Sequence, residues 1–313
     1  MAKRFQTKMA SSRIALPTSA FLAVIVFVVT GGITHQWWLQ LGLVAATTYL
    51  LAELNNFHSL LRTYSRMVSC SFLALMCIYA FLFSDIIIGI TALSTTLMYT
   101  FMFQCYQYRN AVNMTYLAFL SIGMCSMFFV HILYFVPLLW ISMAIFLFSM
   151  TLRTFMASLV GLITPYWFAV LAYVYLNRIG DLTAHFTALA EFRPLFDYTC
   201  LSENSILTFI FVVVLFIIGT THYIRQNYQD KIKIRMFYNI FILISLAAII
   251  FIILQPQHYN ALMGVLMISV SPIIGHFVAL TSTRFTNIGV IALLAAVVLL
   301  TVYNLWSGIL SNL

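Results

Sequence analysis

The chain has 313 residues, of which 63% are hydrophobic and only 7% are charged. Soluble domains carry about 25% charged residues, so this composition excludes a soluble globular protein and predicts an all-α integral membrane protein. The formal net charge of +8 is dispersed between apolar runs, which is typical of membrane orientation signals and argues against binding of nucleic acid.

The first apolar run, near residues 17–34, follows a basic amino-terminal segment. No small-residue cleavage pattern comes after it, so we expect an uncleaved helix that anchors the chain. A bilayer crossing needs about 20 apolar residues. We therefore expect one membrane domain over residues 1–313, a bundle of about eleven transmembrane helices. They are placed near 17–34, 37–53, 67–84, 86–106, 111–129, 131–148, 159–177, 205–221, 239–255, 261–281 and 288–306.

The basic residues predict the orientation of this bundle, because cytoplasmic loops retain Lys and Arg. With the amino end inside and alternating helices, only Arg178 and Arg193 fall outside. The carboxyl end then lies outside, and we expect a multi-pass protein of a bacterial inner membrane. The thirteen inner basic residues are Lys3, Arg4, Lys8, Arg13, Arg62, Arg66, Arg109, Arg153, Arg225, Lys231, Lys233, Arg235 and Arg284.

Residues 116–167 combine a Gly, an aromatic-rich hairpin and a Trp, followed by Arg and then by Gly and Pro-Tyr. The residues of this pattern are Gly123, Trp140, Arg153, Gly161, Pro165 and Tyr166. The pattern resembles an uncharacterised polytopic inner-membrane family of Bacteroidota, in which the basic and Trp motif is fuller than the Leu-Arg-Thr-Phe present here. The resemblance implies a multi-pass architecture and an inner-membrane location, but no activity.

Residues 178–204 form the one sizeable outer (periplasmic) loop and hold six of the charged residues. Their apolar residues recur at spacings of three and four, which predicts an amphipathic helix over about 178–193 on the outer face, ended by Pro194. The apolar stripe consists of Ile179, Leu182, Phe186, Leu189 and Phe192.

The polar residues of this loop suggest a site for transfer from a lipid-linked donor. Arg178 and Arg193 are the outer cations, and arginine binds phosphate through two parallel hydrogen bonds. Asp181, His185 and Glu191 are candidate catalytic groups that could move protons. The alternative is a helix that caps the bundle with its charges in water. No closed metal-ligand set is visible, and we expect neither a metal nor another cofactor.

The tenth predicted span contains Ser269, Pro272 and His276 on one helical face. Pro272 should kink the helix and free a carbonyl. An ionisable residue within a span marks a functional site by default, so Ser269 and His276 are candidates for binding a cation, a proton or a polar head group. The alternative is a neutral His276 that is hydrogen-bonded to a neighbouring helix. Before this span, residues 222–238 read as a basic cytoplasmic loop attracted to anionic lipid.

Three functions stay open at this point, and whether the chain is an enzyme is undecided. The first is transfer or translocation of a lipid-linked or amphiphilic envelope precursor at the outer face. The second is proton- or ion-coupled transport of a small solute through the Pro272 and His276 region. The third is a non-catalytic scaffold in an envelope complex. The expected partners are membrane lipid, a lipid-linked substrate and other membrane proteins.

Overall fold

The computed structural model describes residues 9–80, 84–192, 194–281 and 284–311, and these residues form helices and no strands. The all-α prediction is therefore confirmed for this part of the chain. Its α-helices are α2 (Ala15–Val29), α3 (Trp38–His58), α4 (Met67–Ile78), α5 (Ile86–Met102), α6 (Val112–Ser126), α7 (Val136–Ile145), α8 (Leu152–Tyr175), α9 (Ile179–Thr187), α10 (Glu203–Gln226), α11 (Ile232–Leu254), α12 (Tyr259–Leu280) and α13 (Arg284–Ser311).

Six helical segments of the described residues are long and apolar enough to cross a membrane, judged by length and composition, and four shorter helices are also apolar. The protein is a multi-pass membrane bundle. Burial differs sharply among the long segments: 94% of the most apolar window of Pro256–Leu280 is buried, against 17% for Thr286–Trp306. The segment that includes α12 is thus the central one, whereas α13 is peripheral and turns most of its apolar side chains outward.

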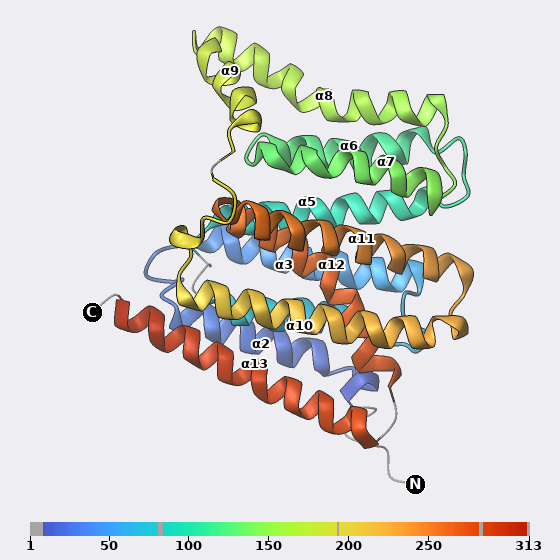
Figure 1. The fold of residues 1–313 in the computed structure, drawn as a ribbon, viewed down its shortest axis with the longest axis vertical. Coiled ribbons are helices and arrows are strands. Elements are labelled where there is room, and N and C mark those ends of the chain that lie inside the picture. The colour runs from blue at the N-terminus through green and yellow to red at the C-terminus, as the bar shows by residue number, and fades with distance from the viewer. Residues whose placement is uncertain (1–8, 81–83, 193, 282–283, 312–313) are drawn as a thin grey trace.

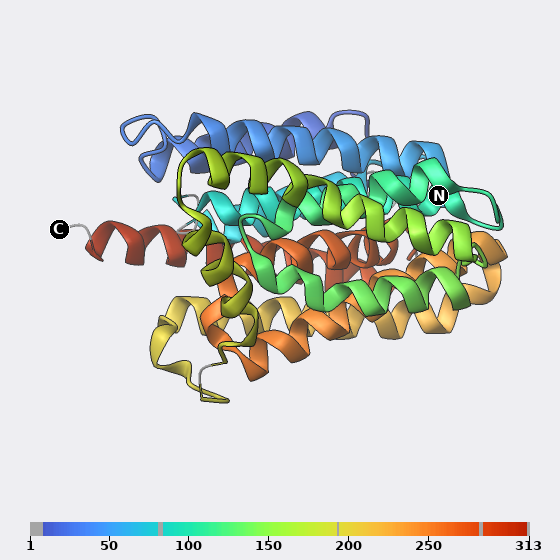
Figure 2. The same cartoon turned by 90° about the horizontal axis from the view of Figure 1, so that it is seen from above.

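Most helices lie side by side along a common direction, whereas α12 and α13 are inclined to it and α9 turns away from the end of α8 (Figure 1; Figure 2). Their connections gather at two ends of the bundle. We call the end that carries Arg62, Arg109 and Lys231 the basic end. The end that carries α9 and Asp85 is called the opposite end. Asp85 accepts a hydrogen bond from Asn260 Nδ2 at 2.8 Å, which joins the beginnings of α5 and α12 there.

The connections that the charge analysis assigned to one side of the membrane do lie together at the basic end. The amide of Gln107 donates to the carbonyl of Leu147 at 2.8 Å and so joins two of these connections. Arg62 contacts Asp230 and joins two others. Helices of a bundle with such tight connections are antiparallel to their chain neighbours. The four connections concerned are 59–66, 103–111, 146–151 and 227–231.

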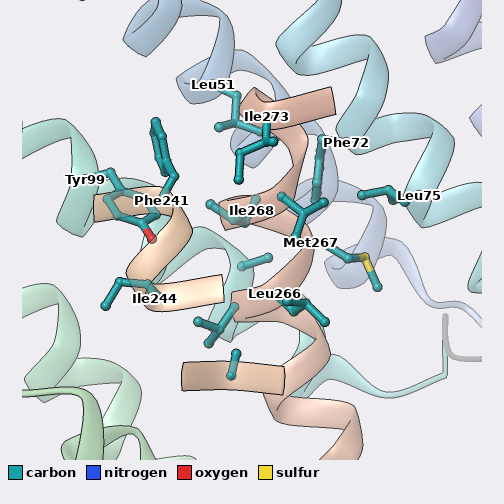
Figure 3. Packing of buried hydrophobic residues seen from close by; sticks show 14 of the residues in the cluster. Leu51, Phe72, Leu75, Tyr99, Phe241, Ile244, Leu266, Met267, Ile268 and Ile273 are labelled. Carbon is teal, nitrogen blue, oxygen red and sulfur yellow. The ribbon is translucent and has the colours of Figure 1, made fainter. Parts of the chain in front are cut away.

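The core is built around α12, which packs against α4, α5, α10 and α11. Figure 3 shows Leu266, Met267 and Ile268 of α12 among side chains of the surrounding helices. Two glycines allow this close approach. A Cβ on Gly264 would collide with a side-chain oxygen and a backbone carbonyl of α5, and one on Gly275 would lie 3.0 Å from the amide nitrogen of Val68 in the first turn of α4. Small residues at such positions are what membrane helices use to pack closely.

A second tight interface joins α6 to α8. A Cβ on Gly161 would lie 2.5 Å from the carbonyl oxygen of Tyr116, and one on Gly123 would lie 2.8 Å from that of Leu162. The indole of Trp140 on α7 adds a hydrogen bond of 3.0 Å to Ser158 on α8. Several residues of the pattern in 116–167 thus hold α6, α7 and α8 together.

Some predicted boundaries differ from those of the structure. The basic connection covers 227–231 rather than 222–238, because α10 continues to Gln226 and α11 begins at Ile232. The helix expected over about 178–193 is α9, which covers only Ile179–Thr187 and continues as a 3-10 turn at Ala188–Ala190. The region 111–148 contains α6 and α7, separated by a 3-10 segment, with Pro137 in the first turn of α7.

Candidate functional site

Three segments that are distant in sequence meet at the basic end and bring together Arg62, Asp230 and His276. Arg62 lies in the connection before α4, Asp230 lies in the connection before α11, and His276 lies in the last turns of α12. Arg62 Nε is 3.0 Å from Asp230 Oδ1, and His276 Nε2 is 3.1 Å from Asp230 Oδ2. We call these three residues the ion cluster.

The ion cluster is buried except on its arginine side. The side chain of Asp230 is 1% exposed and that of His276 is 0% exposed, whereas Arg62 is 33% exposed. A buried carboxylate is unfavourable unless it is paired. Here both carboxylate oxygens face nitrogen. Asp230 Oδ1 and Arg62 Nε form an ion pair without a directed hydrogen bond, and Nη1 of the same guanidinium donates a hydrogen bond to Gln229.

A second histidine lies beside the cluster. The ring centroids of His222 on α10 and His276 are 5.7 Å apart. Both ring nitrogens of His222, and Nδ1 of His276, are buried without a hydrogen-bond partner among the described residues. The rings of Tyr223 and Tyr238 stand against His276 at 5.4 and 5.1 Å. Imidazoles with unused nitrogens beside a carboxylate are groups that can pass on protons.

Local packing explains why His222 reaches this position. Gly219 lies one turn before it on α10, and a Cβ there would be 2.7 Å from Cγ2 of Ile273 on α12. The glycine therefore lets α10 approach α12 closely. On the other side of α12, Tyr238 of α11 donates to the carbonyl of Pro272 at 3.4 Å. The ends of α10, α11 and α12 are thus fixed around the cluster.

Pro272 has a different environment from the one expected. The proline lies inside α12, which continues on both sides of it. The carbonyl of Ile268, which the proline leaves without its usual amide, accepts a hydrogen bond of 3.2 Å from the hydroxyl of Ser271. An intrahelical partner therefore occupies the carbonyl that was expected to be open to a ligand.

The structure does not bring Ser269 and His276 into one site. The hydroxyl of Ser269 donates to the carbonyl of Val265 and contacts Tyr99 Oη at 2.7 Å, toward α5. His276 lies two turns further on and faces Asp230. Sequence reasoning found His276 but missed its partners. One available signal was that Asp230 is the sole acidic residue among the basic residues of 222–238.

The residues proposed for transfer chemistry lie at the opposite end on α9 and the turn after it. Arg178, Asp181 and Glu191 are exposed, and no ion pair joins them to each other in the described part of the chain. His185 contacts the hydroxyl of Tyr166 on α8 at 3.5 Å. Arg193 lies outside the described residues. Among the described residues, no ion pair or side-chain hydrogen bond joins two of these groups, and α9 has no buried residue.

No group of three or more His, Cys, Asp or Glu side chains that could hold a metal ion occurs among the described residues. The comparisons with known proteins add no relative. The chain matches no protein-family model, and no curated protein or solved structure matches it significantly. The resemblance of residues 116–167 to a Bacteroidota membrane family accordingly stays a prediction.

Proposed function

We propose that this protein is a proton-coupled transporter of small solutes, in which Asp230 and His276 carry the coupling proton. The observation that supports this most strongly is their 3.1 Å contact with almost no solvent exposure. Ionisable groups within membrane bundles are rare and characteristically serve as proton relays or ion sites. A carboxylate and an imidazole in contact provide two alternative positions for one proton.

The proton changes the attraction that closes the basic end. With Asp230 ionised, its negative charge holds Arg62, and with it the connection 59–66, against the connection 227–231. Protonation of Asp230 removes that negative charge and releases Arg62. His222 takes up or supplies the proton beside His276. Protonation thus shifts the connection 59–66 from a closed toward an open position, as local changes of charge do in other protein switches.

Polar contacts further along α12 supply groups for the proposed route toward the opposite end. Tyr99 and Ser269 meet near the middle of the bundle. Asn260 and Asp85 meet where α12 and α5 begin. We place the proposed route along α12 because it is the most buried of the long helices.

The orientation that we propose has the basic end in the cytoplasm, eleven crossings and the carboxyl end outside, in a bacterial inner membrane. Its support is the gathering of the connections 59–66, 103–111, 146–151 and 227–231 at one end. Three of them hold at least one Lys or Arg, and the connection 146–151 is followed by Arg153 in the first turn of α8. Handling of a lipid-linked precursor by α9 and a scaffold role stay predictions, since no contact among the described residues favours either.

The proposal is tested in proteoliposomes that enclose a pH-sensitive dye and receive a panel of amino acids, sugars, nucleosides and carboxylic acids. For the wild type, we expect at least one solute to drive proton movement. Asp230→Asn and His276→Gln should abolish this movement, whereas Arg109→Gln, an exposed change at the same end, should not. Proton movement with no solute of the panel, or unchanged movement in the two site variants, would contradict the proposal.

A further inference from the structure

A cavity of about 380 Å³ lies between α2, α3 and α4, and none of its lining residues belongs to the ion cluster. Ligand sites have volumes of roughly 300–1,000 Å³, so this one is large enough to hold part of a small molecule. Ala20 and Ala23 of α2 and Ala45 and Ala52 of α3 line it. The small side chains leave room where larger ones would close the gap between the helices.

The cavity is apolar along most of its length and polar at one end. Leu41 lines it on the early part of α3, whereas Glu53 and Asn56 line it near the end of the same helix. Leu41 and Glu53 are separated by about 18 Å along the helix axis, from the rise per residue. Arg66, directly before α4, joins the two polar residues at the basic end. The cavity therefore has the polarity of an amphiphile.

The two charged residues of the cavity, Glu53 and Arg66, do not form an ion pair with each other. The ion pairs found among the described residues both involve Asp230, so Glu53 and Arg66 are not paired with each other. Within this part of the chain, the Arg66 guanidinium makes a long contact of 3.5 Å to Tyr64 Oη. Glu53 is exposed and Arg66 is half-buried at the rim. A cationic and an anionic side chain thus lie at the polar end of the apolar cavity, where both can bind a ligand.

We propose that this cavity binds a zwitterionic phospholipid of the phosphoethanolamine class. One acyl chain lies along the alanine-lined part, the phosphate pairs with Arg66, and the ammonium pairs with Glu53. Arginine is the side chain best suited to phosphate, and a carboxylate accepts hydrogen bonds from an ammonium group. A purely anionic head group would satisfy Arg66 but leave Glu53 without a cation, so the site should prefer the zwitterion.

The test is native mass spectrometry of the full chain in detergent, titrated with dioleoyl phosphatidylethanolamine and, separately, with dioleoyl phosphatidylglycerol. We expect the wild type to bind the ethanolamine lipid more tightly. Glu53→Gln should lower the affinity for the ethanolamine lipid by about two- to fivefold, which is the contribution of a partly exposed ion pair. The same change should remove the preference for this lipid over the glycerol lipid. Arg66→Gln should lower the affinity for both lipids. Arg109 does not line the cavity, so Arg109→Gln should change neither affinity.

Ala45→Phe supplies an independent check, because its ring would fill the apolar part and leave both charges in place. We expect this variant to have equally reduced affinities for both lipids and the same unfolding temperature as the wild type. If that variant does not fold, the change Glu53→Gln at an exposed residue still tests the proposal. Equal affinity of the wild type for the two lipids, a preference unchanged by Glu53→Gln, or no effect of Arg66→Gln would each overturn the proposal. None of these outcomes depends on transport activity.

Discussion

Nε2 of His276 lies 3.1 Å from Oδ2 of Asp230, although the histidine belongs to the last turns of α12 and the aspartate to the connection before α11. Both side chains are almost wholly excluded from solvent. Neither residue would be stable there alone. Removing one member of a buried pair leaves the other without compensation, whereas removing both can be nearly neutral.

This dependence predicts the stability of single and double variants. We expect His276→Leu to destabilise the protein by about 3–5 kcal/mol, the usual loss when one partner of a buried pair is removed. The double change His276→Leu with Asp230→Asn should recover part of that loss. Unfolding followed by circular dichroism in mixed micelles measures both. Additive losses in the double variant would show that the two residues do not interact.

His222 allows transport and stability to be separated. Its two nitrogens are buried without a partner among the described residues, so His222→Phe should keep or slightly raise stability while slowing proton movement. His58 is a matched control. It is also buried with unpartnered nitrogens in that part of the chain, but its ring packs against Phe103 and Phe237 instead of the ion cluster. His58→Phe should leave proton movement unchanged, and equal effects of the two changes would argue against a relay through His222.

The close approach of α5 and α12 predicts a sharp difference between two glycines. Gly264→Ala should destabilise the protein by about 1–3 kcal/mol, the typical effect of overpacking a core, because its Cβ would meet a carbonyl of α5. Gly42→Ala should be neutral or stabilising by up to about 1 kcal/mol, since Gly42 is helical and has open space around it. Thermal unfolding of both variants checks this ranking. An equal loss of stability in Gly42→Ala and Gly264→Ala would refute it.

The proposed orientation can be tested with an existing thiol. Cys200 is exposed at the opposite end, whereas the other four cysteines are buried or half-buried. A membrane-impermeant maleimide should therefore label intact spheroplasts, and Cys200→Ser should remove the labelling. Labelling that appears only after the membrane is permeabilised would place the opposite end in the cytoplasm and reverse the orientation.

Much of the fold could be predicted from the sequence because a bilayer forces each crossing segment to satisfy its backbone hydrogen bonds internally. The run expected near 86–106 is α5, Ile86–Met102, and the run near 261–281 is α12, Tyr259–Leu280. The ends were less predictable. Residues 222–226 are mostly polar, yet they continue α10, because His222 and Tyr223 pack inward against His276.

The candidate site could be predicted only in part. His276 stood out because an ionisable residue in an apolar run is rare. Arg62 and Asp230 lie in connections, where charged residues are ordinarily solvated, and no local pattern indicates that Asp230 turns inward. Their meeting depends on how distant segments pack, which neither hydropathy nor spacing along the chain encodes.

The most direct test of the central claim is to exchange the two residues of the buried pair. Proton movement driven by a transported solute is measured in proteoliposomes for Asp230→His, His276→Asp and the two changes combined. We predict that each single variant is inactive and that the exchanged pair regains proton movement, since it restores a carboxylate beside an imidazole. Full activity in either single variant would contradict the claim that this pair carries the proton.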